Sequence, residues 1–316
     1  MLIVGQRCLE QWGVIMTNKE IKYLLGIDGG GTKTEFLLTD LNENEIKRTF
    51  LGASNPVNIG IENTKAVLQQ GITEICEGFD FAEISVFAGL AGGGTGDLKT
   101  EINNFLGEFG FGAYLNGRDT DSVVKIALKD EDGVAMIMGT GIIAFSSCGG
   151  ELHRVSGRGY LIDKGGCGFN YGSDALTAAF EYLDGRGESA LIFKLVEEKL
   201  GQSLDSSAPA IYAGGATFVA SFAPVVFEAY KQGDDVARKI LERNTYEVAK
   251  IIKTARKHLK NGGKTVICGG LCKQKEILLP FLADYLEGDD LPIFSDEKMI
   301  DGAVLIAKSI AENGEL

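Results

Sequence analysis

Residues 28–34 combine the residue types that bind a polyphosphate. Glycine has no Cβ atom, so backbone N–H groups can approach a ligand closely, and hydroxyl and ammonium groups add further donors. The segment supplies three glycines and three such donors in succession: Gly29, Gly30, Gly31, Thr32, Lys33 and Thr34. Asp28, directly before them, offers a carboxylate of the kind that holds Mg²⁺ in a phosphate site. An ordinary glycine-rich turn is the alternative interpretation.

A second turn of the same kind occurs later in the chain. In GVAMIMGTGIIAF the turn residues are Gly139, Thr140 and Gly141, and apolar runs flank them on both sides, as they flank the first turn. Apolar runs on both sides of a short turn predict a hairpin of two strands rather than a strand followed by a helix. The near-repeat suggests two related halves.

Two other glycine motifs fit less well. The segment 263–265 ends like a Walker P-loop, but position 258 is histidine and a strand pattern comes next. Gly139, Gly141 and Ala144 match a dinucleotide fingerprint, yet the residues after the turn are β-rich where a helix should begin.

The elements that would position these turns alternate between strands and helices, which predicts an α/β protein. Strands are expected near 23–27, 46–50, 84–88, 113–115, 133–138 and 264–268. Helices are expected over 61–76 and 98–108, from Asp121 or Ser122, between Ser173 and about His258, over 275–286, and from 301.

The first residues differ in pattern from the rest of the chain. Residues 1–15 do not share the alternation of strands and helices, and Met16 is a plausible first residue of the protein. We therefore expect residues 1–15 to be an upstream extension or a poorly ordered arm. The expected domains are an arm over 1–20, an N-terminal domain over 21–125 and a C-terminal domain over 126–300. The final helix, about 301–316, would pack back on the N-terminal domain.

Composition narrows the function classes. The chain has 316 residues and a formal net charge of −13, which argues against nucleic acid as a partner. No apolar run approaches the length of a membrane span, and six scattered cysteines without a secretory leader indicate a cytoplasmic location with reduced thiols. Two histidines leave few bases for a serine or cysteine triad. The spacing of Cys268 and Cys272 leaves a metal pair as an alternative.

Four motifs in order make the sequence similar to one family. GIDGGGTKTEFLL, GASNP, DGVAMIMGTGIIAF and VICGGLCKQKEILLPFL resemble the motifs of the N-acetylglucosamine kinase and BadF/BadG/BcrA/BcrD-type ATPase family, within the actin-like ATPase and sugar kinase superfamily. The resemblance covers nearly everything from Tyr23 to the C-terminus. It implies two ribonuclease H-like domains, each a mixed five-stranded sheet flanked by helices, with ATP and Mg²⁺ in a cleft between them.

The resemblance also implies roles for individual residues. The two glycine turns would hold the phosphates, Gly269 and Gly270 would lie against the adenosine, and Asp119 would lie near the phosphates. Ser54 and Asn55, in GASNP, and Gly157, Arg158 and Asp163, in SGRGYLIDKGG, match the segments that contact the sugar. The implied activity is ATP-dependent phosphorylation of a small amino sugar such as N-acetylglucosamine. For Asp119 and Asp121, capping of the adjoining helix is the alternative.

Two segments depart from the family pattern. In GLAGGGTGD, Gly94 stands where the family has its catalytic aspartate, and Asp97 comes three residues later as the nearest substitute. In the sugar segment, Arg158 replaces a tryptophan and Lys164 an aspartate, which favours an anionic or phosphorylated ligand. Asp97 and Asp119 are therefore the two candidates for the base.

Three functions compete on these observations. The first is a sugar kinase, with a possible homodimer as its assembly. The second is a BadF-type activator ATPase, which would use Cys167 for an iron–sulfur cluster shared between subunits. The third is a sugar-binding sensor that has lost catalysis, as the glycine at position 94 would suggest.

Overall fold

The computed structural model describes residues 15–16, 20–94 and 96–312. The chain forms two compact units. Unit 1 contains the residues up to Asp130 and those from Glu297 onward, and unit 2 contains Glu131–Asp296. The last helix therefore belongs to the same unit as the first strands.

The sheet of unit 1 is mixed and has the strand order β1-β6-β5-β2-β3-β4. Its strands are β1 (Ile15–Met16), β2 (Tyr23–Gly29), β3 (Thr34–Asp40), β4 (Glu45–Leu51), β5 (Ile84–Leu90) and β6 (Ala113–Gly117). β2 and β3 form the predicted antiparallel hairpin, and β5 runs parallel to both β2 and β6. The three parallel strands thus end at the same edge of the sheet.

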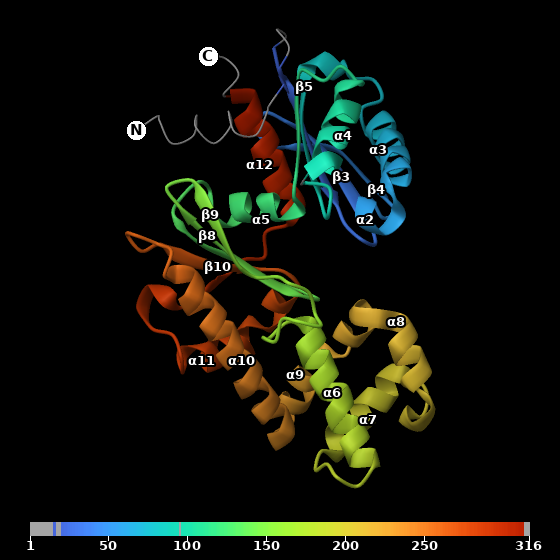
Figure 1. Ribbon diagram of the computed structural model, residues 1–316, viewed down its shortest axis with the longest axis vertical. Helices are drawn as coiled ribbons and strands as arrows, with labels where there is room; N and C mark the ends of the chain where they lie inside the picture. The colour runs from blue at the N-terminus through green and yellow to red at the C-terminus, as the bar shows by residue number, and fades with distance from the viewer. Residues whose placement is uncertain (1–14, 17–19, 95, 313–316) are drawn as a thin grey trace. The chain divides into compact units, whose positions relative to one another are not determined.

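Helices cover both faces of this sheet, as Figure 1 shows for α3 and α4 on one face and α12 on the other. Side chains alternate between the faces along a strand, so Leu25 and Ile27 pack in the core beneath α3 and α4, while Leu24 packs with α12. The helices are α2 (Pro56–Ile59), α3 (Ile61–Ile75), α4 (Gly96–Gly107), α5 (Asp119–Leu128) and α12 (Met299–Glu312). A 3₁₀ turn, η1 (Phe81–Glu83), precedes β5.

The sheet of unit 2 repeats the hairpin theme in the order β11-β10-β7-β8-β9. Its strands are β7 (Gly133–Met138), β8 (Ile142–Cys148), β9 (Glu151–Ser156), β10 (Lys264–Cys268) and β11 (Ile293–Phe294). β7, β8 and β9 are antiparallel neighbours, and β10 is parallel to β7. The second predicted glycine turn joins β7 to β8.

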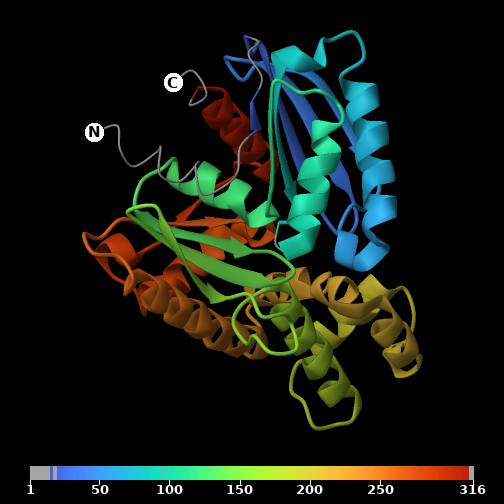
Figure 2. The same ribbon diagram turned by 45° about the horizontal axis from the view of Figure 1, so that its top comes forward.

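The helices of unit 2 share one large core with its sheet. They are α6 (Gly168–Leu183), α7 (Ala190–Leu200), α8 (Ala208–Ala220), α9 (Ala223–Lys231), α10 (Asp235–Arg256) and α11 (Lys275–Ala283). The 3₁₀ turns are η2 (Leu204–Ser206), η3 (Gly270–Gln274) and η4 (Gly288–Asp290). Figure 2 shows α6 to α9, coloured yellow-green to amber, gathered beside the strands.

The structure corrects three expectations. The sequence predicts an upstream extension or a poorly ordered arm over residues 1–15; residues 1–14 lie outside the described residues, but Ile15 pairs with Tyr114 of β6, which gives unit 1 a sixth, edge strand. α5 begins at Asp119 because the Asp121 carboxylate accepts the backbone N–H of Arg118 and so caps the helix. α6 begins at Gly168, earlier than expected, because glycines obscure its sequence signal.

No single helix among the residues described here is both long and apolar enough to cross a membrane. One bent pair, α8 with α9, meets the length and composition test across a 63° bend.

Candidate active site

Three of the predicted segments come directly after the carboxyl ends of parallel strands in unit 1. Gly29, at the end of β2, pairs with Leu90 of β5, and Gly89 pairs with Gly117 of β6. The glycine turn, the loop after β5 and the start of α5 therefore leave the sheet side by side. Ligands of α/β proteins commonly bind at such an edge.

The first glycine turn is closed by its own backbone. The N–H of Gly30 donates to the Lys33 carbonyl at 3.0 Å, and the Gly30 carbonyl accepts the N–H of Ser54 at 3.0 Å. A Cβ atom on Gly29 would lie 2.3 Å from both Ser54 Oγ and Leu90 Cδ2, so the chain passes where only glycine fits. At Gly30 the nearest atom to an added Cβ is the Lys33 carbonyl oxygen, at 3.4 Å. The turn is tight, with its tip open.

The donors of this turn divide into two groups. Thr32 and Lys33 are exposed, whereas Thr34 is buried and its hydroxyl donates to the Gly52 carbonyl at 2.7 Å. Gly31 is also exposed at the tip. Of the predicted donors, Thr32, Lys33 and the backbone N–H groups are thus available to a ligand. Thr34 instead stabilises the hairpin.

Asp28 and Asp119 form a carboxylate pair. Asp28 precedes the glycine turn on β2, and Asp119 is the first residue of α5. Burial is the main cause that raises the pKa of Asp28 to about 6, and the negative charges of Asp119 and Glu35 contribute to the rise. Burial likewise raises the pKa of Asp119. Such a pair favours a bound cation. The cation would offset the repulsion between the two carboxylates and the loss of solvation that each carboxylate suffers on burial.

Glu35 was not identified from the sequence as a residue of the site. A carboxylate within a buried strand is unusual, and this could have indicated it. Glu35 is 8% exposed, and it forms ion pairs with Arg48 and with Lys33, the latter at 3.6 Å. The Lys33 ammonium also lies 5.2 Å from the centroid of the Phe50 ring. Lys33 is therefore held beside the turn by two contacts from β3 and β4.

The loop after β5 contains the position where the family pattern has its aspartate. A Cβ atom on Gly94 would lie 2.5 Å from both the backbone nitrogen and Cγ of Arg118, so no side chain fits without movement of the chain. Asn116 anchors this loop, since its side-chain amide donates to the Gly93 carbonyl at 2.7 Å. Asp97 is exposed in the first turn of α4 and is not among the charges that shift the pKa of Asp28.

The predicted sugar residues Ser54 and Asn55 lie next to the glycine turn. Asn55 caps α2, where its side-chain oxygen accepts the N–H of Val57 at 2.9 Å. Ser54 is fully buried, and its hydroxyl has no hydrogen-bond partner in the described part of the chain. Asn55 is partly exposed, so its amide is the more accessible of the two.

In unit 2 the second glycine turn rests on the start of α6. The Gly139 carbonyl accepts the N–H of Gly168 at 2.7 Å, and the Thr140 carbonyl accepts the N–H of Phe169 at 3.0 Å. No atom lies within 4 Å of a Cβ added to Gly139 or Gly141. The turn is therefore firmly seated, and its outer side is open.

The predicted adenosine motif lies next to that turn in the sheet. Gly269 comes directly after β10 with φ +111°, and a Cβ atom there would lie 2.7 Å from the Met138 carbonyl oxygen of β7. Gly270 has open space around it and begins η3. Cys272, in the same motif, is buried and its thiol donates to the Ile267 carbonyl at 3.2 Å. Burial raises the pKa of Cys272 to about 11, which disfavours the thiolate that a metal pair with Cys268 would need.

The predicted sugar segment of unit 2 is a folded loop closed by Asp163. Its carboxylate accepts the backbone N–H groups of Arg158 and of Gly159, the latter at 3.1 Å. Gly157 precedes them with φ +75°, against Ile143 of β8. The family resemblance implies that Asp163 contacts the sugar, whereas here its carboxylate holds the loop.

Cys167 is a buried thiol rather than an exposed ligand. It is 2% exposed, and its sulfur donates to the Asn170 side-chain oxygen at 2.8 Å at the start of α6. Burial raises the pKa of this thiol. Among the described residues, no group of three or more His, Cys, Asp or Glu side chains could hold a metal ion.

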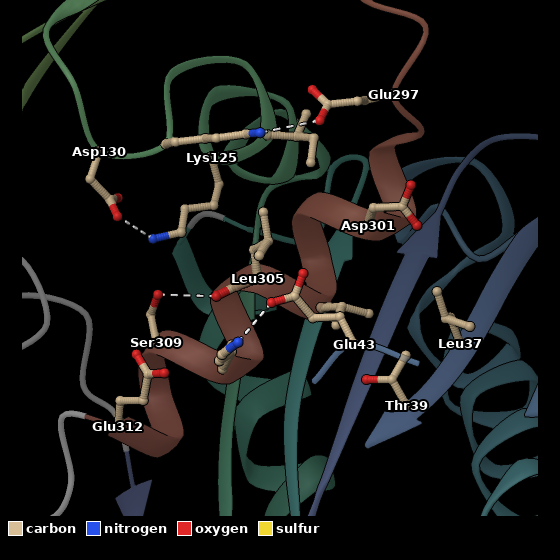
Figure 3. A pocket seen from close by; sticks show the side chains of 14 residues that line it. Leu37, Thr39, Glu43, Lys125, Asp130, Glu297, Asp301, Leu305, Ser309 and Glu312 are labelled. Carbon is tan, nitrogen blue, oxygen red and sulfur yellow. Dashed lines mark hydrogen bonds and ion pairs between the residues drawn. The ribbon is translucent and has the colours of Figure 1, made fainter. Parts of the chain in front are cut away.

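A groove of about 550 Å³ lies elsewhere in unit 1, between β3, α5 and α12. Figure 3 shows charged side chains along the groove. Lys125 forms an ion pair with Asp130, and Lys308 of α12 forms one with Glu43. Lys129, the third lysine of the groove, pairs with a carboxylate as well. None of the predicted site residues lines this groove, so it is distinct from the edge that carries Asp28.

Comparison with known proteins decides the family. The model of the BadF/BadG/BcrA/BcrD ATPase family matches residues 25–307. The chain belongs to this family. Both glycine turns, the loop after β5 and the Asp163 loop lie inside the matched range, and membership implies the use of ATP.

Three relatives illustrate the similarity. An N-acetylmuramic acid/N-acetylglucosamine kinase from Clostridium acetobutylicum is 29% identical over 92% of this chain and 99% of its own length. An N-acetyl-D-glucosamine kinase from Dictyostelium discoideum is 28% identical over 92% of this chain and 98% of its own. A crystal structure assigned as an N-acetylglucosamine kinase from Chromobacterium violaceum has a TM-score of 0.69 at 22% identity, covering 91% of this chain and 99% of that one. The fold class predicted from the sequence is confirmed.

Proposed function

We propose that this protein transfers the γ-phosphoryl group of ATP to a hydroxyl of an amino sugar such as N-acetylglucosamine. The observation that carries the proposal is the Asp28–Asp119 pair beside the glycine turn of β2, because it supplies carboxylates where a triphosphate would need a cation. The names of both sequence relatives support an amino sugar as the acceptor.

The transfer requires one bond to form and one to break. The acceptor hydroxyl oxygen attacks the γ-phosphorus, the bond from that phosphorus to the β,γ-bridging oxygen breaks, and the hydroxyl proton passes to a carboxylate. ADP and a sugar phosphate are the products. Thr32, Lys33 and the backbone N–H groups of the glycine turns would hold the phosphates and neutralise their charge.

Asp28 and Asp119 fit Mg²⁺ as the cation. Mg²⁺ in kinases is bound by one or two carboxylates together with substrate phosphates and water, and the repulsion between these two carboxylates contributes to the raised pKa of Asp28. When bound, Mg²⁺ would neutralise charge on the β- and γ-phosphates. We assign Asp28 as its principal ligand.

For the base we propose Asp97, one of the two candidates that the sequence offers. It is exposed in the first turn of α4, next to the loop that would otherwise carry the acid at Gly94. Asp119 would then interact with the metal and the phosphates.

The remaining assignments concern the sugar and the adenosine. Asn55 would contact the sugar, and Gly269 and Gly270 would contact the adenosine.

The two other functions are less well supported. An activator ATPase would need Cys167 as an accessible thiolate, whereas its thiol is buried and donates a hydrogen bond to Asn170. A sensor without catalysis would not need the raised pKa of the Asp28–Asp119 pair, which costs stability at neutral pH.

The test is acceptor-dependent release of ADP. Purified protein with ATP and Mg²⁺ should release ADP rapidly only when an amino sugar is added, and a panel of neutral sugars without the amide should be poorer acceptors. ADP release that ignores every acceptor would favour the activator ATPase. No release with any acceptor, together with tight sugar binding, would favour the sensor.

A further inference from the structure

The groove between β3, α5 and α12 has a surplus of negative charge, and all the residues that line it belong to unit 1. Three lysines and five carboxylates line it. Each of the lysines, Lys125, Lys129 and Lys308, forms an ion pair with one of the carboxylates. The two carboxylates that remain are Asp301 and Glu312, and neither forms an ion pair within the described part of the chain. A ligand of positive charge would find two free partners here.

Asp301 and Glu312 lie on the same side of α12 but far apart along it. Their positions differ by eleven residues, which is close to three helical turns and corresponds to roughly 16 Å along the axis. One metal ion cannot bridge that distance, and among the described residues no group of three or more His, Cys, Asp or Glu side chains could hold a metal ion. The two carboxylates therefore suit an extended ligand with more than one positive charge.

The floor of the groove is apolar. Leu37 of β3 is 4% exposed and Val304 of α12 is 2% exposed, and both line the groove. Val304 comes one turn after Asp301, so its side chain lies on the stretch of α12 between the two carboxylates. Methylene groups of a bound ligand would contact this floor while its charged groups remain with the carboxylates.

A buried hydroxyl of the groove has no partner. Thr39 of β3 is 1% exposed, and its Oγ1 atom forms no hydrogen bond with any residue that the structure describes. Leu37 and Thr39 are two residues apart in the strand, so both side chains face α12, and Figure 3 shows the Thr39 oxygen on the side of that helix. A buried polar group without a partner is costly, and a donor on a bound ligand would remove that cost.

From these observations we propose that the groove binds a linear aliphatic polyamine. Ammonium groups near its two ends pair with Asp301 and Glu312, its methylene groups contact Leu37 and Val304, and an ammonium between them donates a hydrogen bond to the Thr39 hydroxyl. None of the residues proposed for ATP, Mg²⁺ or the sugar lines this groove, so the inference does not depend on the kinase function.

Calorimetry with spermine, a linear tetra-amine, measures the binding, and the protein should bind one spermine per chain. Two diamines of equal charge then separate length from charge: dodecanediamine, with one amine at each end, reaches both carboxylates, whereas propanediamine reaches only one. Dodecanediamine should bind more tightly by about tenfold or more, because only the longer chain makes two ion pairs and buries many methylene groups. No binding of spermine, or equal affinity for the two diamines, would overturn the inference.

Substitutions in the groove locate the site. Asp301→Asn and Glu312→Gln keep the shape of the side chain and remove its charge, so each should weaken spermine binding, by about threefold to fivefold. Thr39→Val removes the hydroxyl and should also weaken spermine binding, while the melting temperature of the free protein should not fall because the hydroxyl has no partner to lose.

Glu77→Gln is the matched control, because Glu77 is an exposed carboxylate of unit 1 outside the groove, just after α3. It removes the same charge and should leave spermine binding unchanged. An equal loss of affinity in Glu77→Gln and Glu312→Gln would show a diffuse attraction to an acidic protein and overturn the inference. Unchanged affinity in both Asp301→Asn and Glu312→Gln would overturn it as well.

Discussion

Asp28 is a residue at which stability and proposed function conflict. Its folded-state pKa of about 6 lies above the ordinary value of 3.8 because burial and the charges of Asp119 and Glu35 disfavour the carboxylate. Between these two values the folded chain binds more protons than the unfolded chain, so the free energy of unfolding falls as the pH rises through this window. Above about pH 6 the contribution of this group to the free energy of unfolding no longer changes with pH.

Asp28→Asn should therefore stabilise the metal-free protein at pH 7. The expected gain is on the order of 3 kcal/mol, because the pKa of Asp28 rises from 3.8 to about 6 and one pKa unit corresponds to about 1.4 kcal/mol. Thermal melts with a chelator at pH 4 and pH 7 measure it, and the difference between the variant and the wild-type protein should be small at pH 4. A variant less stable than the wild-type protein at pH 7 would show that the carboxylate is stabilising.

The proposed roles of Asp97 and Asp119 can be distinguished by the effects of their variants on the catalytic rate and on its dependence on Mg²⁺. Asp97→Asn should lower turnover by two orders of magnitude or more, about 3 kcal/mol, with nucleotide affinity nearly unchanged. Asp119→Asn should lower the rate and also raise the Mg²⁺ concentration that gives half-maximal activity. Steady-state kinetics across a Mg²⁺ titration measure both. Full activity in Asp97→Asn would assign the base to Asp119.

At the scale of elements, the loop after β5 shows why the family aspartate cannot simply be restored. Gly94→Asp would place a Cβ atom 2.5 Å from the backbone nitrogen of Arg118, so the start of α5 would have to move. We expect a lower melting temperature, corresponding to roughly 1–3 kcal/mol, and no gain in turnover. Gly52→Asp is the control, since nothing lies within 4 Å of a Cβ at that exposed glycine. A stable, more active Gly94→Asp variant would contradict this account of the loop.

The strands were more predictable than the helix starts. Both hairpins could be predicted because apolar runs on either side of a short glycine turn specify adjacent antiparallel strands, as β2–β3 and β7–β8 show. The start of α6 was missed because its cap is a pair of Cys167 and Asn170 between glycines, a combination rare at helix starts. The roles of Glu35 and Asp163 could not be predicted, since each depends on partners that only the folded chain brings near: Arg48 for Glu35, and the Arg158 N–H for Asp163.

At the scale of the whole molecule, each unit carries one glycine turn that we propose as a contact for the phosphates of ATP. Gly30→Val and Gly139→Val should each weaken ATP binding at least tenfold, because a branched side chain would stand where backbone must approach phosphate. Both positions have room for a small side chain, so the melting temperatures should change little. Calorimetry with a non-hydrolysable ATP analogue measures the affinity. Unchanged binding in the Gly139→Val protein would remove unit 2 from the phosphate site.

The proposed reaction transfers phosphate to a sugar rather than to water. The most direct measurement uses ATP labelled in its γ-phosphate, incubated with the protein, Mg²⁺ and N-acetylglucosamine, with subsequent separation of sugar phosphate from inorganic phosphate. The label should appear in a sugar phosphate, with one ADP formed for each, and little label should be released without sugar. Label recovered only as inorganic phosphate, at a rate independent of the sugar, would contradict it.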